Sequence, residues 1–371
     1  MASPPIPAKN EWLRAAETLA IAALGGLVLS WLGFPAGLVT GSLLGVAAAA
    51  LLGRPVFVPA SLSRVISVLV GISLGAVVSP ETLKGLAAFP LSVAVLAIST
   101  LCMMIATTSY LRFVHGWDAQ SALFGASPGA LAQVMVLSAD YKADLRAIAI
   151  VQTMRVVALT IGIPAGLTFF GLTAEGGIMA RFVAAGPPSI SELAILVAVS
   201  TAAALLVWRL RFPGGLMFGA MLASAILHGI GFIHATLPWW VVFAAVIGIG
   251  AVTGSRFANT DPGTLLRFLG AALGSFAVAM TVAALSVLLL TTLMSVRIAD
   301  AVVAFAPGAQ DTMMVLALAL HLDPVFVGAL HLSRFLLVSM LMPFLAYRLR
   351  RGPDKPLRER PPGATRPTIE D

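Results

Sequence analysis

Long apolar stretches follow one another along the chain, separated by short polar intervals. Six such elements occupy about 13–32, 34–52, 60–79, 87–111, 119–138 and 145–171, and six more occupy about 190–209, 213–231, 237–256, 264–294, 299–320 and 324–348. A helix needs about 20 apolar residues to cross a bilayer, and most of these elements reach that length. Membrane-spanning strands would instead require short segments of alternating polarity. The pattern therefore predicts an all-α integral membrane protein.

The composition agrees with this interpretation. Hydrophobic residues make up 59% of the chain and charged residues 11%, and the mean hydropathy is +0.99. Soluble globular domains are far more polar than this. Lys9 and Arg14 flank the start of the first stretch, but no small-residue cleavage site and polar segment follow it. We therefore expect the first stretch to be a retained helix and not a signal peptide.

The two halves of the chain repeat each other at an offset of about 179 residues. The segment "FPAGLVTGSLLG" (34–45) matches "FPGGLMFGAMLA" (212–223), and "SPGA" (127–130) matches "APGA" (306–309). The same offset aligns further pairs, namely Gly71 with Gly250, Gly75 with Gly254, Asp144 with Asp323, and Arg155 with Arg334. We expect two membrane repeats, 1–186 and 187–350, followed by a disordered, basic cytoplasmic tail at 351–371.

The charges in the loops favour one topology over another, because cytoplasmic loops of membrane proteins are enriched in Lys and Arg. If all elements crossed the membrane, with both termini inside, more loop cations would lie outside than inside. If the Pro-Gly element of each half enters and leaves on the same side, only Lys84, Arg181 and Arg297 lie outside. The sequence thus predicts an inverted repeat in which each half has five transmembrane helices and one broken, re-entrant element. Both termini would be cytoplasmic.

The Pro-Gly breaks are the predicted binding site. Pro128-Gly129 and Pro307-Gly308 interrupt the helical hydrogen bonding, which lipid cannot replace. Paired broken segments in inverted repeats are typical of transporter binding sites. A helix that resumes near Ala130 or Ala309 would direct its positively polarised end towards an anion. The candidate residues around the breaks are Ser127, Pro128, Gly129, Gln133, Pro307, Gly308, Gln310, Asp311 and Thr312.

Asp311 is the only carboxylate beside a break, since the first half has Ala132 at the same place. An ionisable side chain within the membrane is a functional candidate, and here it would bind a cation or a proton. The alternative is that Asp311 caps the helix that starts beside it. Both uses require a carboxylate near a helix start, so the sequence leaves them open.

The sixth element of each half carries a matched set of polar residues. Arginine near the middle of an apolar helix cannot easily reach water, so it should contact a carboxylate, a carbonyl group or a substrate anion. One interpretation is substrate binding; the other is a structural clamp that holds the free carbonyl groups of the broken element. At helical spacing, the residues of each set share one face, and they are Asp144, Gln152 and Arg155 in the first half and Asp323, His331 and Arg334 in the second.

Other chemistry finds little support. Cys102 is the only cysteine, and the five histidines show no metal-ligand spacing, so we expect neither a disulfide nor a metal centre. The chain contains no Walker-type nucleotide motif. Much of the net charge of +7 comes from the carboxyl-terminal tail, which fits a topology anchor at anionic lipid better than nucleic-acid binding. We expect no enzyme activity, no cofactor and no nucleic-acid partner.

From about residue 15 to 348 the chain resembles the AbrB membrane family. The resemblance rests on "GFPAGLVTGSLLG", "GASPGALAQVMVLSADYKADLRAIAIVQTMRV" and "FAPGAQDTMMVLALALHLDPVFVGALHLSRFLL". It implies a multi-pass inner-membrane protein, in a family whose members carry labels such as ammonia monooxygenase or regulator of AidB expression. The monooxygenase label requires a cluster of metal ligands that this sequence lacks. The chain has Gln133 where the family pattern leads us to expect an acidic residue, which argues against a site with two carboxylates.

Together these features favour a secondary transporter or exporter of a small anionic solute, coupled to H⁺ or Na⁺ and located in the bacterial inner membrane. Its partners would be membrane lipid, the solute and the coupling ion; the sequence leaves a homodimer open. The alternative is a membrane-embedded sensor that affects gene expression indirectly, without transport or direct DNA binding. The sequence does not identify the solute.

Overall fold

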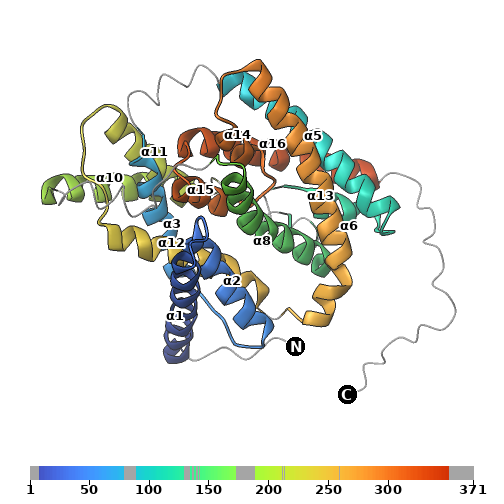
Figure 1. The fold of residues 1–371 in the computed structure, drawn as a ribbon, viewed down its shortest axis with the longest axis horizontal. Coiled ribbons are helices and arrows are strands. Elements are labelled where there is room, and N and C mark those ends of the chain that lie inside the picture. Colours follow the sequence, from blue (N-terminus) through green and yellow to red (C-terminus); the bar gives the residue numbers. More distant parts are fainter. Residues whose placement is uncertain are drawn as a thin grey trace.

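The computed structural model describes residues 8–78, 89–128, 134–135, 138, 141, 143–172, 189–210, 212, 214–258 and 260–350 (Figure 1). Throughout these residues the regular elements are helices. The first half contains α1 (Ala8–Trp31), α2 (Gly37–Leu51), α3 (Ala60–Gly75), α5 (Phe89–Phe113), α6 (Ala119–Ala126) and α8 (Leu145–Phe169).

The second half repeats this order. It contains α10 (Ile190–Arg209), α11 (Gly215–Gly229), α12 (Trp239–Gly254) with the 3-10 turn η2 (Ser255–Phe257), α13 (Pro262–Leu293), α14 (Ile298–Phe305), α15 (Gln310–Ala319) and α16 (Pro324–Arg350). Most of the predicted boundaries lie within a few residues of these helix ends. The tail at 351–371 lies outside the described residues, so its predicted disorder is untested.

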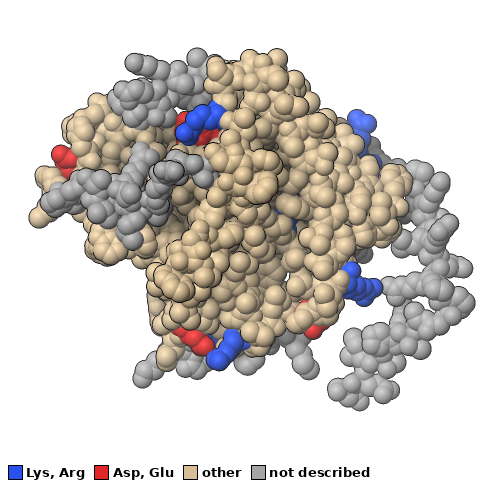
Figure 2. Space-filling model, in the orientation of Figure 1, with Lys and Arg blue, Asp and Glu red and all other residues tan. Residues whose placement is uncertain are grey.

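Within the described part of the chain, seven helices are long and apolar enough to cross a membrane, namely α1, α5, α8, α10, α12, α13 and α16, and the apolar helices α2, α3 and α11 are shorter. Several large hydrophobic side chains point outward, including Leu27, Leu205 and Leu285. Figure 2 shows a face with few charged side chains, most of them at its margins. Such an apolar exterior suits contact with lipid. The prediction of an all-α chain with helices fit to span a membrane is confirmed for the described residues.

Glycine allows the matched segments of the two halves to pack closely. A Cβ atom on Gly71 would collide with the carbonyl oxygen of Met217, where α3 crosses α11. A Cβ atom on Gly250 would collide with Ser42, where α12 crosses α2. Helices α3 and α12 are equivalent in the two halves, and so are α11 and α2. The repeated glycines therefore have the same packing role in both halves.

Contacts between the halves occur in matched pairs. Helix α2 packs on α12 as α11 packs on α3, and α8 packs on α13 as α16 packs on α5. Two further contacts, α3 with α12 and α5 with α13, join equivalent helices directly. Each of these contacts therefore has a counterpart in which the two halves have exchanged places.

The broken element of the second half lies at the centre of this arrangement. Helix α14 ends at Phe305, the backbone leaves the helical conformation through the Pro-Gly pair, and α15 begins at Gln310. Helix α15 packs against α3, α8, α12 and α16, among the helices in the middle of Figure 1. The predicted break at Pro307-Gly308 is confirmed.

The first half shows the beginning of the same break. Helix α6 ends at Ala126, and Ser127 and Pro128 follow in non-helical conformation. The candidate residues Gly129 and Gln133 lie outside the described residues. The structure therefore does not test the helix predicted to resume near Ala130.

Candidate functional site

In the second half an arginine and a histidine of α16 hold the carboxyl-terminal end of α14. The guanidinium of Arg334 donates from Nη1 to the carbonyl oxygen of Ala306 at 2.5 Å and from Nη2 to that of Ala304 at 3.1 Å. His331 Nε2 lies 3.1 Å from the carbonyl oxygen of Val303. These carbonyl groups have lost their helical partners, because α14 ends here. The α16 side chains satisfy them.

The first half repeats this contact at the same spacing. Arg155 of α8 donates from Nη2 to the carbonyl oxygen of Gly125 at 2.7 Å and from Nη1 to that of Ser127 at 3.3 Å. Gln152 Nε2 donates to the carbonyl oxygen of Phe124 at 2.8 Å, and Ser127 Oγ lies 3.4 Å from the same nitrogen. We call these two arrangements the arginine clamps. They match the structural interpretation of the arginines, and no observation bears on direct solute contact.

The clamps place two positive charges inside the protein. Arg155 is 3% exposed and Arg334 is 1% exposed. Among the described residues, the ion pairs are Arg54 with Glu17 and Arg297 with Asp300, so neither clamp arginine has a carboxylate partner there. The negative ends of the α6 and α14 dipoles offset part of each charge. The Nε atoms of both arginines also lack an acceptor among the described residues.

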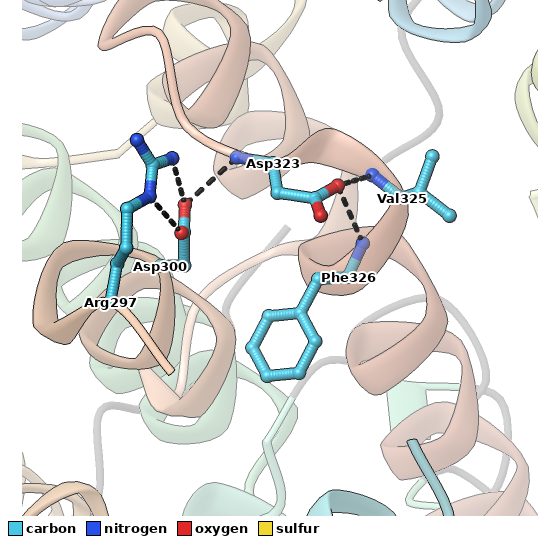
Figure 3. A network of polar contacts seen from close by, with 5 residues as sticks. All are labelled: Arg297, Asp300, Asp323, Val325 and Phe326. Carbon is cyan, nitrogen blue, oxygen red and sulfur yellow. Dashed lines mark hydrogen bonds and ion pairs between the residues drawn. The ribbon is translucent and has the colours of Figure 1, made fainter. Parts of the chain in front are cut away.

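Asp144 and Asp323 lie just before the helices that carry the clamps. Asp144 Oδ1 accepts hydrogen bonds from the amides of Arg146 and Ala147 at the start of α8. Asp323 Oδ1 likewise accepts from Val325 and Phe326 at the start of α16 (Figure 3). Each carboxylate is therefore an N-cap, about three turns from the clamp arginine of its helix.

In the second half, an ion pair supports this cap. Asp300 accepts two hydrogen bonds from Arg297, at 2.6 and 2.9 Å, and a third from the amide of Asp323 at 2.8 Å (Figure 3). The hydrogen-bonded carboxylate of Asp300 raises the pKa of Arg297 above its ordinary value. In the first half, Ser121 Oγ accepts from the amide of Asp144 at 2.8 Å. Sequence analysis did not identify Arg297 and Asp300 as a pair, because the aligned residues are Asp118 and Ser121.

The start of α15 carries the remaining candidates. Ala309 is the N-cap, and no side chain caps the helix. Asp311 makes no hydrogen bond to another residue that the structure describes, so the capping interpretation has no contact to support it. The carboxylate of Asp311 interacts electrostatically with the guanidinium of Arg256 in η2. Thr312 Oγ1 lies 3.3 Å from Thr253 Oγ1 of α12.

Arg256 was not among the predicted site residues. It follows an apolar helix directly, where a cation is typical of a cytoplasmic loop, and the first half has Val77 at the equivalent position. The only sequence feature that could have identified Arg256 as a site residue is that the first half has no charged residue at the aligned position. Within the described residues, no group of three or more His, Cys, Asp or Glu side chains could hold a metal ion.

Comparison with known proteins places this geometry in a family. The model of the AbrB family, described as transition state regulatory protein AbrB, matches residues 38–350. The "Uncharacterized protein YhjN" of Bacillus subtilis (strain 168) is 25% identical over 352 residues, which cover 88% of this chain and 90% of that protein. The "Putative regulator AbrB" of Escherichia coli (strain K12) is 26% identical over 258 residues, which cover 70% of this chain and 74% of that protein.

Proposed function

Because the chain belongs to the AbrB family, we propose that it is a secondary transporter or exporter of a small anionic solute, coupled to H⁺ or Na⁺. Its place is the bacterial inner membrane. The single observation that carries this proposal is the central broken element, where an uncapped helix start lies among helices of both halves. Broken helices at the interface of two repeats are the usual construction of transporter sites.

The electrostatics of the centre favour an anion. Arg155 and Arg334 are buried without carboxylate partners among the described residues, and the start of α15 adds a positively polarised helix end. Asp311 is the candidate for a cation or proton that moves with the solute. The clamp arginines would hold the broken elements in place.

The topology is part of the proposal. Each half would have five crossings and one re-entrant element, with a pseudo-twofold axis in the membrane plane and both termini in the cytoplasm. The loop charges support this arrangement, and so do the matched contacts between the halves. Ala174→Cys should be labelled from outside and Arg211→Cys from inside, in a variant that lacks Cys102. Labelling of either position from the opposite side would contradict the inverted topology.

The proposed activity requires no catalytic residue and no cofactor. Purified protein in liposomes, preloaded with candidate carboxylates or amino acids, should give counterflow or electrogenic currents that depend on a proton or sodium gradient. Asp311→Asn should abolish this gradient dependence. Silence across a broad set of solutes, from protein that is correctly folded, would count against transport.

The second candidate function is a membrane-embedded sensor that regulates gene expression without transporting anything. It draws on the printed name of the Escherichia coli relative, which describes a regulator. A sensor would bind its effector at the same centre and produce no flux. Effector-dependent changes in transcript levels that persist in a transport-dead variant would favour this function.

A further inference from the structure

A polar cluster at the crossing of α12 and α15 has no equivalent in the first half. Two of its members are charged, the others are threonine and glutamine, and together they are Thr253, Arg256, Gln310, Asp311 and Thr312. The residues about 179 positions earlier are Leu74, Val77, Leu131, Ala132 and Gln133. The scaffold is therefore duplicated, but this cluster exists once.

The geometry brings the two charged groups towards each other without contact. The hydrogen bond between Thr253 and Thr312 joins α12 to α15. Arg256 lies one turn beyond Thr253, and Asp311 directly precedes Thr312, so the charges flank this bond. They interact electrostatically, yet no N···O distance within 4.0 Å joins them as an ion pair. The guanidinium of Arg256 and the carboxylate of Asp311 are thus in electrostatic range of each other but do not form a salt bridge.

The groups of this cluster have hydrogen-bonding capacity to spare. Arg256 and Asp311 make no hydrogen bonds to the described residues, and each keeps part of its surface accessible. Gln310 is 8% exposed, and its side-chain amide has no partner in the described part of the chain. Its Nε2 lies beside Gly214, where α11 begins. An unpartnered polar side chain buried to this extent is costly unless a ligand or water satisfies it.

We propose that this cluster is the solute site and that the solute is a zwitterion carrying a carboxylate and an ammonium group, as free amino acids do. This inference rests on the proposed transport function, and it revises the solute from a simple anion to one that carries an ammonium group beside its carboxylate. The carboxylate lies on the guanidinium fork of Arg256 and near the amino end of α15. The ammonium group lies on Asp311, in the place that the transport proposal gives to a separate coupling cation. Gln310 and Thr312 supply uncharged hydrogen bonds.

Charge balance explains the preference for a zwitterion. A ligand with both charges leaves neither Arg256 nor Asp311 uncompensated. A carboxylate without an ammonium group would satisfy Arg256 but approach the negative charge of Asp311, and an amine without a carboxylate would meet the reverse problem. Bringing like charges together in a binding site costs several kcal/mol, which is enough for strong discrimination.

Binding to the purified full-length protein tests this directly. Glycine, L-alanine, L-leucine and L-glutamate would be compared by isothermal titration with their N-acetyl forms and their methyl esters. At least one free amino acid should bind about tenfold or more tightly than either of its masked forms. Equal binding of a masked form, or no binding of any free amino acid, would overturn the assignment.

Two variants separate the roles of the charges. Asp311→Asn should bring the ratio of the affinities for the free amino acid and its N-acetyl form close to one. Arg256→Gln should bring the ratio of the affinities for the free amino acid and its methyl ester close to one. Each is a ratio within one protein sample, so partial unfolding does not affect it. The control Arg267→Gln, at an exposed arginine of α13, should keep both ratios; unchanged ratios in the Asp311 and Arg256 variants would contradict the proposal.

The outcome separates this inference from the function on which it rests. Selective binding of a free amino acid without flux in liposomes would support the site and contradict transport. Flux of an N-acetylated or purely carboxylic solute, with no preference for free amino acids, would support transport and contradict the zwitterion.

Discussion

The broken elements of the two halves differ in a way that separates scaffold from chemistry. Arg155 and Arg334 grip carbonyl groups at identical spacing, and Asp144 and Asp323 cap the helices that carry them. Beyond the break, the halves diverge, because only the second has Asp311 and its distant partner Arg256. Backbone carbonyl groups at a helix end must be satisfied in both halves. A charged site is needed only once.

The largest expected effect comes from removing a clamp arginine. Arg334→Leu should leave the carbonyl group of Ala304 unpaired inside the protein and that of Ala306 with only the Gly308 amide, with a loss of about 3–5 kcal/mol of stability. Arg155→Leu should lose a similar amount, since its contacts are equivalent. Thermal unfolding of the purified variants measures this. If only one of the two substitutions lowered the stability, the two clamps would not be equivalent.

Lysine at either position should be milder but still harmful. It keeps the charge and reaches one carbonyl group, but it lacks the planar fork that reaches two. Arg155→Lys and Arg334→Lys should lower transport in liposomes at equal protein amounts. Wild-type transport by both would leave these arginines without a part in the transport cycle.

Glycine at the helix crossings is next in expected effect. Gly71→Ala and Gly250→Ala should each cost about 1–3 kcal/mol, because the added methyl group forces α3 from α11 or α12 from α2. Gly162→Ala in α8 is the matched control, since nothing lies within 4 Å of its added Cβ atom. The unfolding temperatures of the three variants test this prediction. A comparable loss of stability in Gly162→Ala would show that the effect comes from replacing glycine in a helix and not from the helix crossings.

The helix caps should contribute less. Asp144→Ala and Asp323→Ala remove two amide hydrogen bonds each and should cost about 1 kcal/mol. The loss at Asp323 should be larger if its contact with the Arg297–Asp300 pair also loosens. Combining Asp323→Ala with Asp300→Ala in a double-mutant cycle measures that coupling, and strictly additive losses would show that the cap and the ion pair are independent.

Asp311→Asn should have the smallest effect on stability and a large effect on function. No side-chain cap of α15 is lost, so unfolding should change by less than about 0.5 kcal/mol. Gradient-dependent transport should disappear, because an amide cannot compensate a cation. Normal transport by well-expressed Asp311→Asn protein would remove this carboxylate from the mechanism.

Much of the fold was predictable because a membrane imposes simple rules. Apolar length located most helix ends to within a few residues, and the internal repeat located the Pro-Gly breaks. An arginine in the middle of an apolar helix had to find acceptors, so the clamp was one of two expected arrangements. The orientation of the chain in the membrane stays a prediction.

Other parts of the site were hidden for physical reasons. Arg256 stands where a helix leaves the apolar region, and a cation there is ordinary. The Arg297–Asp300 pair replaces Asp118 and Ser121, so the repeat offered no template for it. The repeat reveals contacts that both halves preserve. It cannot reveal contacts that arose in one half alone.

The arginine clamps also have a mechanical meaning. Each clamp joins the end of a short helix to the middle of a long one through charge-assisted hydrogen bonds, so α14 must travel with α16, and α6 with α8. Among the described residues, no side-chain hydrogen bond joins α15 to a clamp arginine, so the residues between Ala306, which Arg334 holds, and Gln310 are the candidate hinge. Rocking of the α14–α16 body would therefore change the angle at Pro307-Gly308. It would thereby swing the start of α15, with its carboxylate, relative to Arg256.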